Sequence, residues 1–277
     1  MKIVVLDGKS LAADDLSYDA FSQFGELTVY DGTSHTETIS RIADADVILT
    51  NKVVISKDIM DACPSIKLII VMATGYNVID IEAAKERGIV VTNIPAYSTN
   101  AVAQYVFACI LNYTNRITEH NESVQNGDWI RSDCFSYRVA PLYELSGKTL
   151  GIVGFGAIGK AVSKIAKAFD MNVLVYSRTI YPQFEDSKLR FVDLITLLEN
   201  SDFVTLHCPL TAATQNMITK KELELMRPSA MLINSARGPI VNEEDLAEAL
   251  KNKTISYAAL DVLRSEPMQE NSPLLNA

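Results

Sequence analysis

Gly154, Gly156 and Gly159 are the residues of this sequence best suited to binding a phosphate group. An apolar run, Thr149–Val153, precedes them, and a second one, Val173–Tyr176, follows after a stretch with helical periodicity. The order is strand, turn, helix and strand. In such a unit Gly154 allows the tight turn, Gly156 allows a pyrophosphate to approach the backbone, and Gly159 allows the helix to pack closely on its strand. A tight turn without a ligand is the alternative. Because helix N-termini attract anions, we predict a dinucleotide site here.

Polar side chains stand where other predicted strands end. His207 directly follows one apolar run, and Arg237 stands in the short loop after another. Asp261 ends the last run, with Glu266 shortly beyond it. Ligands of open parallel sheets bind beyond the carboxyl ends of the strands. Each residue also has a plainer interpretation. Arg237 can be a solvated loop arginine and His207 can make only local hydrogen bonds, while Asp261 can cap a turn and Glu266 can be a turn residue. Topology alone therefore nominates these positions without deciding between the two interpretations.

Alternating strands and helices must position these residues, beginning with a first domain over 1–98. Stretches with helical periodicity, such as 36–43 and 79–87, separate its apolar runs. This alternation predicts a parallel sheet covered by helices. The turns at 50–52 and 73–77 fall at strand ends. The predicted strands are Ile3–Leu6, Leu27–Tyr30, Val47–Thr50, Leu68–Met72 and Ile89–Val91.

The second predicted domain spans 99–277 and contains the glycine turn. One long helix from Ala101 to about Ser123 opens it, suits domain bridging or subunit contact, and ends at Asn126-Gly127-Asp128. We expect a doubly wound parallel sheet, with a cleft between the two domains if their sheets face each other. Further strands are predicted at Phe203–His207, Ala230–Asn234 and Ile255–Asp261, and further helices at Asp193–Glu199, from Thr219, and at Glu243–Lys251.

Composition narrows the class of partner. The 277 residues carry a net charge of −9, which argues against nucleic acid or an anionic membrane as a main partner. The four cysteines have no CxxC spacing, so we expect no metal site, no disulfide framework and a cytoplasmic location. Charge interrupts the first residues too early for a signal peptide, and no apolar run is long enough to span a membrane.

Taken together, the motifs resemble those of the D-isomer-specific 2-hydroxyacid dehydrogenases, over essentially the whole chain. The motifs are Gly154-Phe155-Gly156-Ala157-Ile158-Gly159, His207-Cys208-Pro209-Leu210-Thr211, Asn234-Ser235-Ala236-Arg237-Gly238, and Asp261-Val262 with Glu266-Pro267. Within that family, Val5-Leu6-Asp7-Gly8, the turns at 50–52 and 73–77, and Asp133-Cys134-Phe135 look most like glycerate dehydrogenases, also called hydroxypyruvate reductases.

The resemblance implies an NAD(P)-dependent enzyme that reduces a small 2-keto acid, hydroxypyruvate or glyoxylate, to the D-2-hydroxy acid. Arg237 and Glu266 would be catalytic, because a guanidinium can bind two substrate oxygens and Glu266 would keep a histidine protonated. The substrate would contact Asn51, Lys52, Thr74 and Gly75, in a flavodoxin-like substrate-binding domain. The dinucleotide would contact Gly154, Gly156, Ala157, Ile158, Gly159, Cys208, Pro209, Thr214, Ala236 and Asp261, in a Rossmann domain. A homodimer is expected.

Other interpretations within and beyond this family remain. D-3-phosphoglycerate and D-lactate are alternative substrates, and some relatives of the family act as corepressors that sense a dinucleotide. The family's catalytic histidine lies in a Pro-His element beyond Glu266, and none of the three histidines here, His35, His120 and His207, matches its position. Either the sequence continues beyond Ala277, into that element and a final segment returning to the first domain, or this form lacks its acid/base. We expect the first.

The choice between NAD and NADP depends on the end of the second strand of the glycine unit. NAD sites carry an acidic residue there, for the ribose 2′-hydroxyl. This chain has Ser177 and Arg178 instead, with Asp170 before the strand and Glu185 well after it. Serine can donate a hydrogen bond to a 2′-phosphate, and arginine can pair with its charge. NADP is slightly favoured, although Arg178 stacked on adenine would also allow NAD.

Overall fold

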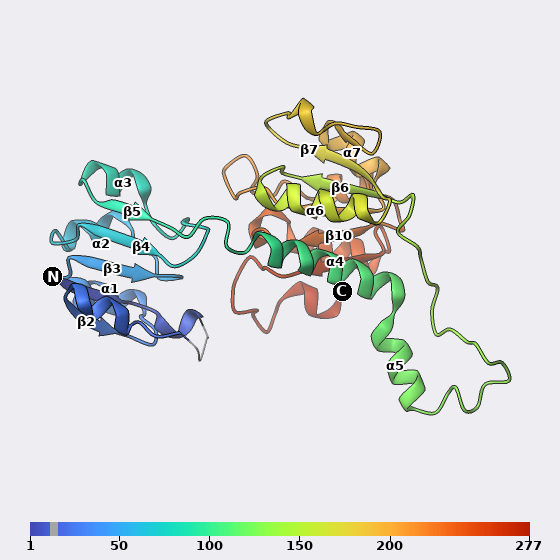
Figure 1. Cartoon of the computed structure of the whole chain (residues 1–277), viewed down its shortest axis with the longest axis horizontal. Coiled ribbons are helices and arrows are strands. Elements are labelled where there is room, and N and C mark those ends of the chain that lie inside the picture. The colour runs from blue at the N-terminus through green and yellow to red at the C-terminus, as the bar shows by residue number, and fades with distance from the viewer. Residues whose placement is uncertain (12–15) are drawn as a thin grey trace. The chain divides into compact units, whose positions relative to one another are not determined.

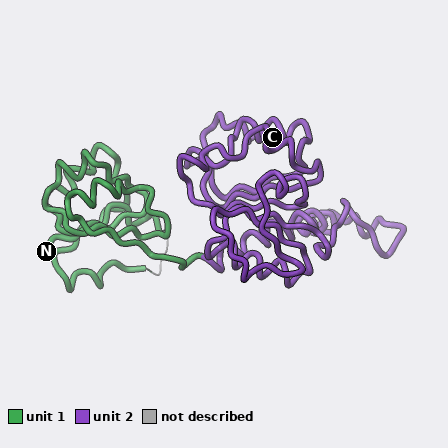
Figure 2. The backbone as a smooth tube through the Cα atoms, turned by 90° about the horizontal axis from the view of Figure 1, so that it is seen from above, with its two compact units in different colours: residues 1–98 green, residues 99–277 purple. Residues whose placement is uncertain are grey.

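Strands and helices alternate along the chain (Figure 1), as the sequence predicts. The structure, a computed structural model, describes residues 1–11 and 16–277. It divides into two compact units, Met1–Ser98 and Thr99–Ala277 (Figure 2). Each unit is built on its own parallel β-sheet. The predicted fold class, α/β with two Rossmann-like parallel sheets, is thereby confirmed.

Unit 1 has the strand order β2-β1-β3-β4-β5, with parallel neighbours throughout. This is the 2-1-3-4-5 order of flavodoxin-like sheets. The side chains of β3 are buried throughout, and those of β4 alternate between half-buried and buried, because helices cover the sheet. The elements are β1 (Lys2–Val5), β2 (Glu26–Val29), α1 (His35–Ile42), β3 (Val47–Thr50), α2 (Lys57–Ala62), β4 (Leu68–Val71), α3 (Ile81–Glu86) and β5 (Val90–Thr92), with 3-10 turns η1 (Gly8–Leu11) and η2 (Asp19–Phe24).

Unit 2 has the strand order β11-β10-β9-β6-β7-β8, again all parallel. Read from β8, this is the 3-2-1-4-5-6 order of dinucleotide-binding sheets, and the order reverses between β6 and β9. The sheet strands are β6 (Thr149–Val153), β7 (Asn172–Tyr176), β8 (Leu189–Phe191), β9 (Phe203–Leu206), β10 (Met231–Asn234) and β11 (Tyr257–Leu260). The helices are α4 (Thr99–Asn115), α5 (Ile117–Gln125), α6 (Ala157–Ala168), α7 (Leu194–Asn200), α8 (Lys220–Leu225) and α9 (Glu243–Lys251), with 3-10 turns η3 (Pro182–Phe184), η4 (Gly238–Ile240) and η5 (Pro273–Asn276).

Helices cover both faces of the second sheet. On one face α4 packs beside α6, where Phe107 and Phe169 stack with ring centroids 5.6 Å apart (Figure 1). On the other face α7, α8 and α9 bury leucines such as Leu197 and Leu246 against β9 and β10. Because a sheet residue faces one layer or the other, strands buried on both sides are continuously apolar. This packing holds the carboxyl ends of the strands in place.

The long helix predicted from Ala101 to about Ser123 is wrong in one respect. The structure has two helices, α4 and α5, and Arg116 between them adopts a left-handed conformation with φ of 50°. The guanidinium of Arg116 lies over the ring of Tyr113, 4.8 Å from its centroid. The core explains the break, because α4 buries side chains up to Thr114, whereas α5 buries only Ser123. Figure 1 shows α5 and the irregular segment after it extending away from the sheet.

Most predicted element boundaries agree with the structure to within one or two residues. The capping box at Thr219 and Glu222 is present, and α9 has the predicted bounds. The structure also contains α2 and β8, which the sequence does not predict. Both are short, with six and three residues, so they span too few residues to show a periodicity.

Candidate active site

The glycine turn lies where strand order reverses in unit 2. Gly154 has φ of +98°, and a Cβ atom there would lie 2.7 Å from the backbone nitrogen of Cys208. A Cβ atom on Gly159 would lie 2.2 Å from the carbonyl oxygen of Gly154. Gly156, by contrast, has no heavy atom within 4 Å of that position. Two of the glycines are therefore required by packing, and the third faces open space.

The start of α6 has the features of a phosphate site. Its N-cap residue is Gly156, which offers no side-chain hydrogen bond, and its first turn contains no acidic residue. Gly156 and Ala157 are exposed, and Ile158 is half-buried. The N–H groups of a helix start need acceptors, and the helix dipole favours an anion there. The residues at this turn therefore fit the pyrophosphate of a dinucleotide.

Beside the glycine turn, the end of β9 carries His207, Cys208 and Pro209. The Nε2 atom of His207 lies 3.0 Å from Oγ1 of Thr205, and its Nδ1 atom is buried with no hydrogen-bond partner among residues 1–11 and 16–277. Desolvation lowers the pKa of His207 to about 4. The ring is therefore uncharged near neutral pH, which favours the local interpretation over acid catalysis. Thr214 closes the loop, its Oγ1 donating to the carbonyl oxygen of Pro209 at 2.6 Å.

The side chain of Asn234, the last residue of β10, organises the loop that holds Arg237. Its amide nitrogen donates to the carbonyl oxygen of Arg237 at 2.9 Å, and its amide oxygen accepts from the N–H of Ala236 at 3.1 Å. Arg237 is half-buried, and its Nη1 donates to the carbonyl oxygen of Ala236 at 2.7 Å. Asn234 itself is buried. A buried amide thus determines where the arginine stands.

The loops after β10 and β11 touch at Gly238. A Cβ atom there would lie 1.9 Å from the carbonyl carbon of Leu263, so only glycine fits. Asp261 donates its N–H to the carbonyl oxygen of Asn234 at 3.0 Å, and Glu266 accepts from the N–H of Leu263 at 3.0 Å. Both carboxylates are exposed. The structure therefore brings the loops of Arg237, Asp261 and Glu266 together at the carboxyl ends of adjacent strands.

At the end of β7, Ser177 is half-buried and Arg178 is exposed. A surface pocket of about 560 Å³ opens here, and Ser177 forms part of its wall. Asp193, the N-cap of α7, lies in the same wall. The sequence does not reveal this carboxylate, because Asp193 lies beyond the next strand of the chain and only the fold brings it to this pocket. The other lining residues are Tyr176, Ile180, Phe191, Val192 and Thr196.

In unit 1, Asp7 holds the turn that contains Asn51 and Lys52. Its buried carboxylate accepts from the N–H of Asn51 at 2.9 Å, of Lys52 at 2.6 Å and of Val53 at 3.3 Å. Asn51 is half-buried and Lys52 is exposed. Asp7 belongs to the Val5-Leu6-Asp7-Gly8 motif, and the resemblance implies no role for it. The structure gives it one, because three backbone donors converge on its carboxylate.

The second predicted substrate turn of unit 1 is tied to the segment after β5. The hydroxyl of Thr74 donates to the carbonyl oxygen of Ile94 at 2.9 Å, and Asn93 donates to the carbonyl oxygen of Thr74 at 2.8 Å. Thr74 is exposed and Gly75 is half-buried. The first bond uses the side chain of Thr74, and the second uses its backbone carbonyl. The turn therefore has a defined position at the end of β4.

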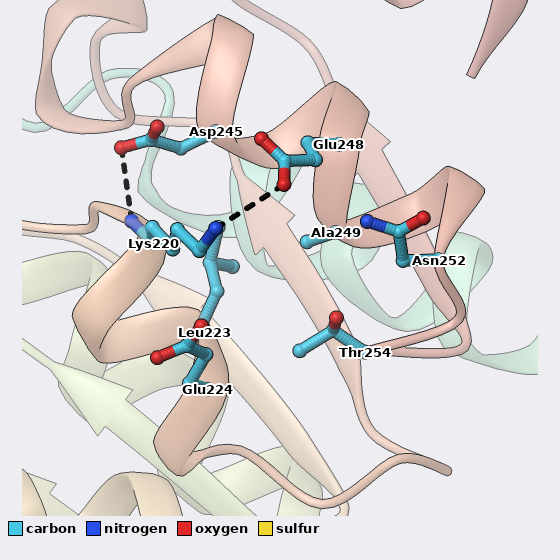
Figure 3. A pocket seen from close by; sticks show the side chains of 8 residues that line it. All are labelled: Lys220, Leu223, Glu224, Asp245, Glu248, Ala249, Asn252 and Thr254. Carbon is cyan, nitrogen blue, oxygen red and sulfur yellow. Dashed lines mark hydrogen bonds and ion pairs between the residues drawn. The ribbon is translucent and has the colours of Figure 1, made fainter.

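Another hollow of unit 2 lies between α8 and α9 (Figure 3). Its volume is about 90 Å³, room for roughly three water molecules. Lys220 closes it by binding Glu248 through Nζ at 3.2 Å and Asp245 through its N–H at 2.9 Å. The space is too small for a dinucleotide or a substrate with its contacts. It is therefore not the candidate active site.

Over residues 1–11 and 16–277, no cluster of three or more His, Cys, Asp or Glu side chains could hold a metal ion. Nor does the described part of the chain contain a helix long and apolar enough to cross a membrane. His35 is exposed, and the Nδ1 atom of His120 lies 2.8 Å from the carbonyl oxygen of Arg116.

Comparison with known proteins places this geometry in a family. The family model described as "D-isomer specific 2-hydroxyacid dehydrogenase, NAD binding domain" matches residues 107–277. A hydroxypyruvate reductase of Blautia hydrogenotrophica is 42% identical over 100% of this chain and 87% of its own. A glycerate dehydrogenase of Methylorubrum extorquens is 40% identical over 100% of this chain and 85% of its own. An acyclic imino acid reductase, solved with NADPH and D-Arg, has a TM-score of 0.84, 30% identity, and coverage of 99% of this chain and 86% of its own.

These matches agree with the glycine turn, the strand order and the motifs quoted above. The resemblance inferred from the sequence is confirmed. The chain belongs to the D-isomer-specific 2-hydroxyacid dehydrogenases, oxidoreductases that act on a CH–OH group with a nicotinamide dinucleotide as cofactor.

Proposed function

We propose that this protein reduces hydroxypyruvate or glyoxylate to the D-2-hydroxy acid, D-glycerate or glycolate. The observation that carries the proposal is Arg237, held by the buried Asn234 beside the loop of Asp261 and Glu266. A guanidinium at such a strand end suits a 2-keto acid, because it can bind a carboxylate and a carbonyl oxygen together. The names of the two relatives that align over the whole chain support the choice of substrate.

Each proposed substrate contact has a chemical reason. Arg237 polarises the carbonyl group and stabilises the negative charge that develops on its oxygen. The N–H groups of Thr74 and Gly75 bind the carboxylate, with Asn51 and Lys52 contributing polar and positive groups. Glu266 is the proposed carboxylate partner of the group that supplies the proton. Reduction adds a hydride to the carbonyl carbon and this proton to its oxygen.

The bound dinucleotide supplies the hydride. We propose that its pyrophosphate lies on the N–H groups of Gly156, Ala157 and Ile158. Gly156 has no Cβ atom, and the space at that position is open. Gly154 and Gly159 shape this turn. Asp261 binds the nicotinamide carboxamide. The residues proposed to line the remainder of the cofactor are Cys208, Pro209, Thr214 and Ala236.

The proposed preference between dinucleotides is a slight one for NADP, through Ser177 and Arg178. Their hydroxyl and guanidinium groups suit a 2′-phosphate, and Arg178 is exposed at the end of β7. Ser177→Asp is expected to shift kcat/KM toward NADH, because the new carboxylate repels the phosphate. An unmodified protein that already prefers NADH would contradict this preference.

We further propose a cytoplasmic homodimer, with α4 and the segment after α5 at the contact. Trp129, Ile130 and Phe135 in that segment are 53%, 91% and 88% exposed, and a group of exposed large apolar side chains is typical of an interaction surface. Sedimentation equilibrium of the full-length protein tests this. A monomer whose mass does not change with concentration would contradict it.

Steady-state kinetics of the full-length protein test the activity. Hydroxypyruvate, glyoxylate, 3-phosphohydroxypyruvate and pyruvate are each assayed with NADH and NADPH, by the loss of reduced nicotinamide absorbance. We expect the highest kcat/KM with hydroxypyruvate or glyoxylate. A higher value for 3-phosphohydroxypyruvate or pyruvate would move the protein to another substrate of its family. No turnover of any 2-keto acid would overturn the proposal.

A further inference from the structure

The parallel pairing of β7 with β8 puts Asp193 and Ser177 in the wall of one pocket. In this ladder Val175 pairs with Phe191, and Val192 donates its N–H to the carbonyl oxygen of Val175 at 2.9 Å. β8 ends at Phe191, and two residues further along each chain stand Ser177 and Asp193, at the carboxyl ends of these two strands. Both residues line the pocket of about 560 Å³. Two residues far apart in sequence thus share one wall.

The carboxylate of Asp193 is fixed in position and charged. Its Oδ1 accepts from the N–H of Thr196 at 2.9 Å, and its Oδ2 accepts from the hydroxyl of Thr196 at 2.8 Å. These hydrogen bonds hold the pKa of Asp193 below its ordinary value. A carboxylate oxygen can accept more than one hydrogen bond, so these bonds do not neutralise it as an acceptor or as a charge. It therefore presents a fixed negative charge to the pocket.

We infer that Asp193 is a specificity-determining residue, whose charge opposes Arg178 in the choice between a ribose 2′-hydroxyl and a 2′-phosphate. The inference rests on the proposed function, because it assumes that the adenosine ribose lies at the end of β7. In dinucleotide-binding sheets the ribose is read at the end of the second strand, which is β7 here. Arg178 attracts a 2′-phosphate and Asp193 repels it, so the net selectivity is smaller than Arg178 alone would produce.

Asp193→Asn tests this without removing the helix cap, because Asn and Asp are equivalent N-cap residues. Asp193→Ser, which also caps, is the second variant if the first is unstable. The matched control is Asp170→Asn. Asp170 is an exposed acid that precedes the amino end of β7, and it is bonded to Ser146 and Lys188. Thermal unfolding shows whether each variant is folded.

Isothermal titration calorimetry measures the affinities for two pairs of ligands, NADPH with NADH, and adenosine 2′,5′-bisphosphate with adenosine 5′-monophosphate. The readout is the ratio of affinities within each pair, the 2′-phosphorylated ligand over its partner. We expect Asp193→Asn to raise the affinity for each 2′-phosphorylated ligand relative to its partner by about twofold to fivefold at low salt, the range for one exposed charge. High salt should diminish the change. Asp170→Asn should leave the ratio unaltered.

Two results would overturn the inference while leaving the proposed function intact. They are an unchanged ratio in Asp193→Asn, and equal changes in Asp193→Asn and Asp170→Asn, which would reflect net charge alone. If the unmodified protein bound neither dinucleotide, the proposed function would fail, and the inference with it. Turnover of hydroxypyruvate with an unaltered ratio therefore separates the two failures.

Discussion

A Cβ atom on Gly159 would lie 2.2 Å from the carbonyl oxygen of Gly154, and no real Cβ contact is that short. The third glycine of the turn is thus required by backbone packing between α6 and the end of β6. Gly156, two residues after Gly154, has open space at the same position. The turn therefore separates a structural glycine from a ligand-facing one, and substitutions can distinguish the two.

Gly159→Ala is expected to lower the free energy of unfolding by about 1–3 kcal/mol, the usual cost of forcing an extra atom into a packed interior. The control is Gly156→Ala, which should keep its stability but lose affinity for NADH and NADPH, because its methyl group occupies the space proposed for the pyrophosphate. Urea unfolding and calorimetric titration measure the two quantities. An unaltered unfolding midpoint in Gly159→Ala would refute the packing argument.

Asp7→Asn is expected to destabilise unit 1 by about 1.5–3 kcal/mol, because a buried carboxylate that accepts three backbone N–H groups is replaced by an amide with one acceptor. KM for the 2-keto acid should rise, since the turn of Asn51 and Lys52 loses its support. Asp31→Asn is the matched control, because Asp31 forms an exposed ion pair with Lys9. Equal effects of the two substitutions on unfolding would contradict a special role for Asp7.

Arg237→Ala should reduce kcat of the full-length protein by about 10²–10³-fold, the loss seen when one electrostatic group is removed from a transition state. Affinity for NADH and NADPH should stay nearly unchanged, because the proposed contact is with substrate. Arg227→Ala is the control, since Arg227 forms a half-buried ion pair with Asp202, which precedes the amino end of β9. Normal turnover by Arg237→Ala would remove Arg237 from the proposed mechanism.

His207 predicts a dependence of stability on pH. The pKa of His207 is about 4 in the folded protein, whereas an exposed histidine of the unfolded chain has a pKa of 6.5. The unfolded chain therefore binds the proton first as the pH falls. The stability is therefore fully present above pH 6.5 and is lost between pH 6.5 and 4, by at most about 1.4 kcal/mol per pH unit. His207→Gln, which keeps a hydrogen-bonding group near Thr205, should flatten this part of the curve.

Urea unfolding at a series of pH values measures that slope. His35→Gln, which alters an exposed histidine, is the matched control. Identical slopes in His207→Gln and the unmodified protein would show that other groups cause the loss.

The sequence alone determined the fold class and the family. Glycine spacing, apolar runs and strand-end polar residues are local features of the sequence. The turns, strands and helices that they predict depend largely on short-range backbone sterics and solvation, so these elements can be inferred without coordinates. The Gly154 to Gly159 unit and the loop of Arg237 are where the sequence placed them. Short elements such as β8 escaped detection, because three residues cannot display a periodicity.

Only the tertiary structure decided which distant residues meet. The pairing of β7 with β8 puts Asp193 and Ser177 in the wall of one pocket, and three converging N–H groups give Asp7 a role. Burial lowers the pKa of His207, so its ring is neutral near pH 7. Helix α4 ends at Asn115, where its contacts with the core end. Strand register and desolvation depend on the packing of segments far apart in the chain. For that physical reason no local pattern of residues could have revealed them.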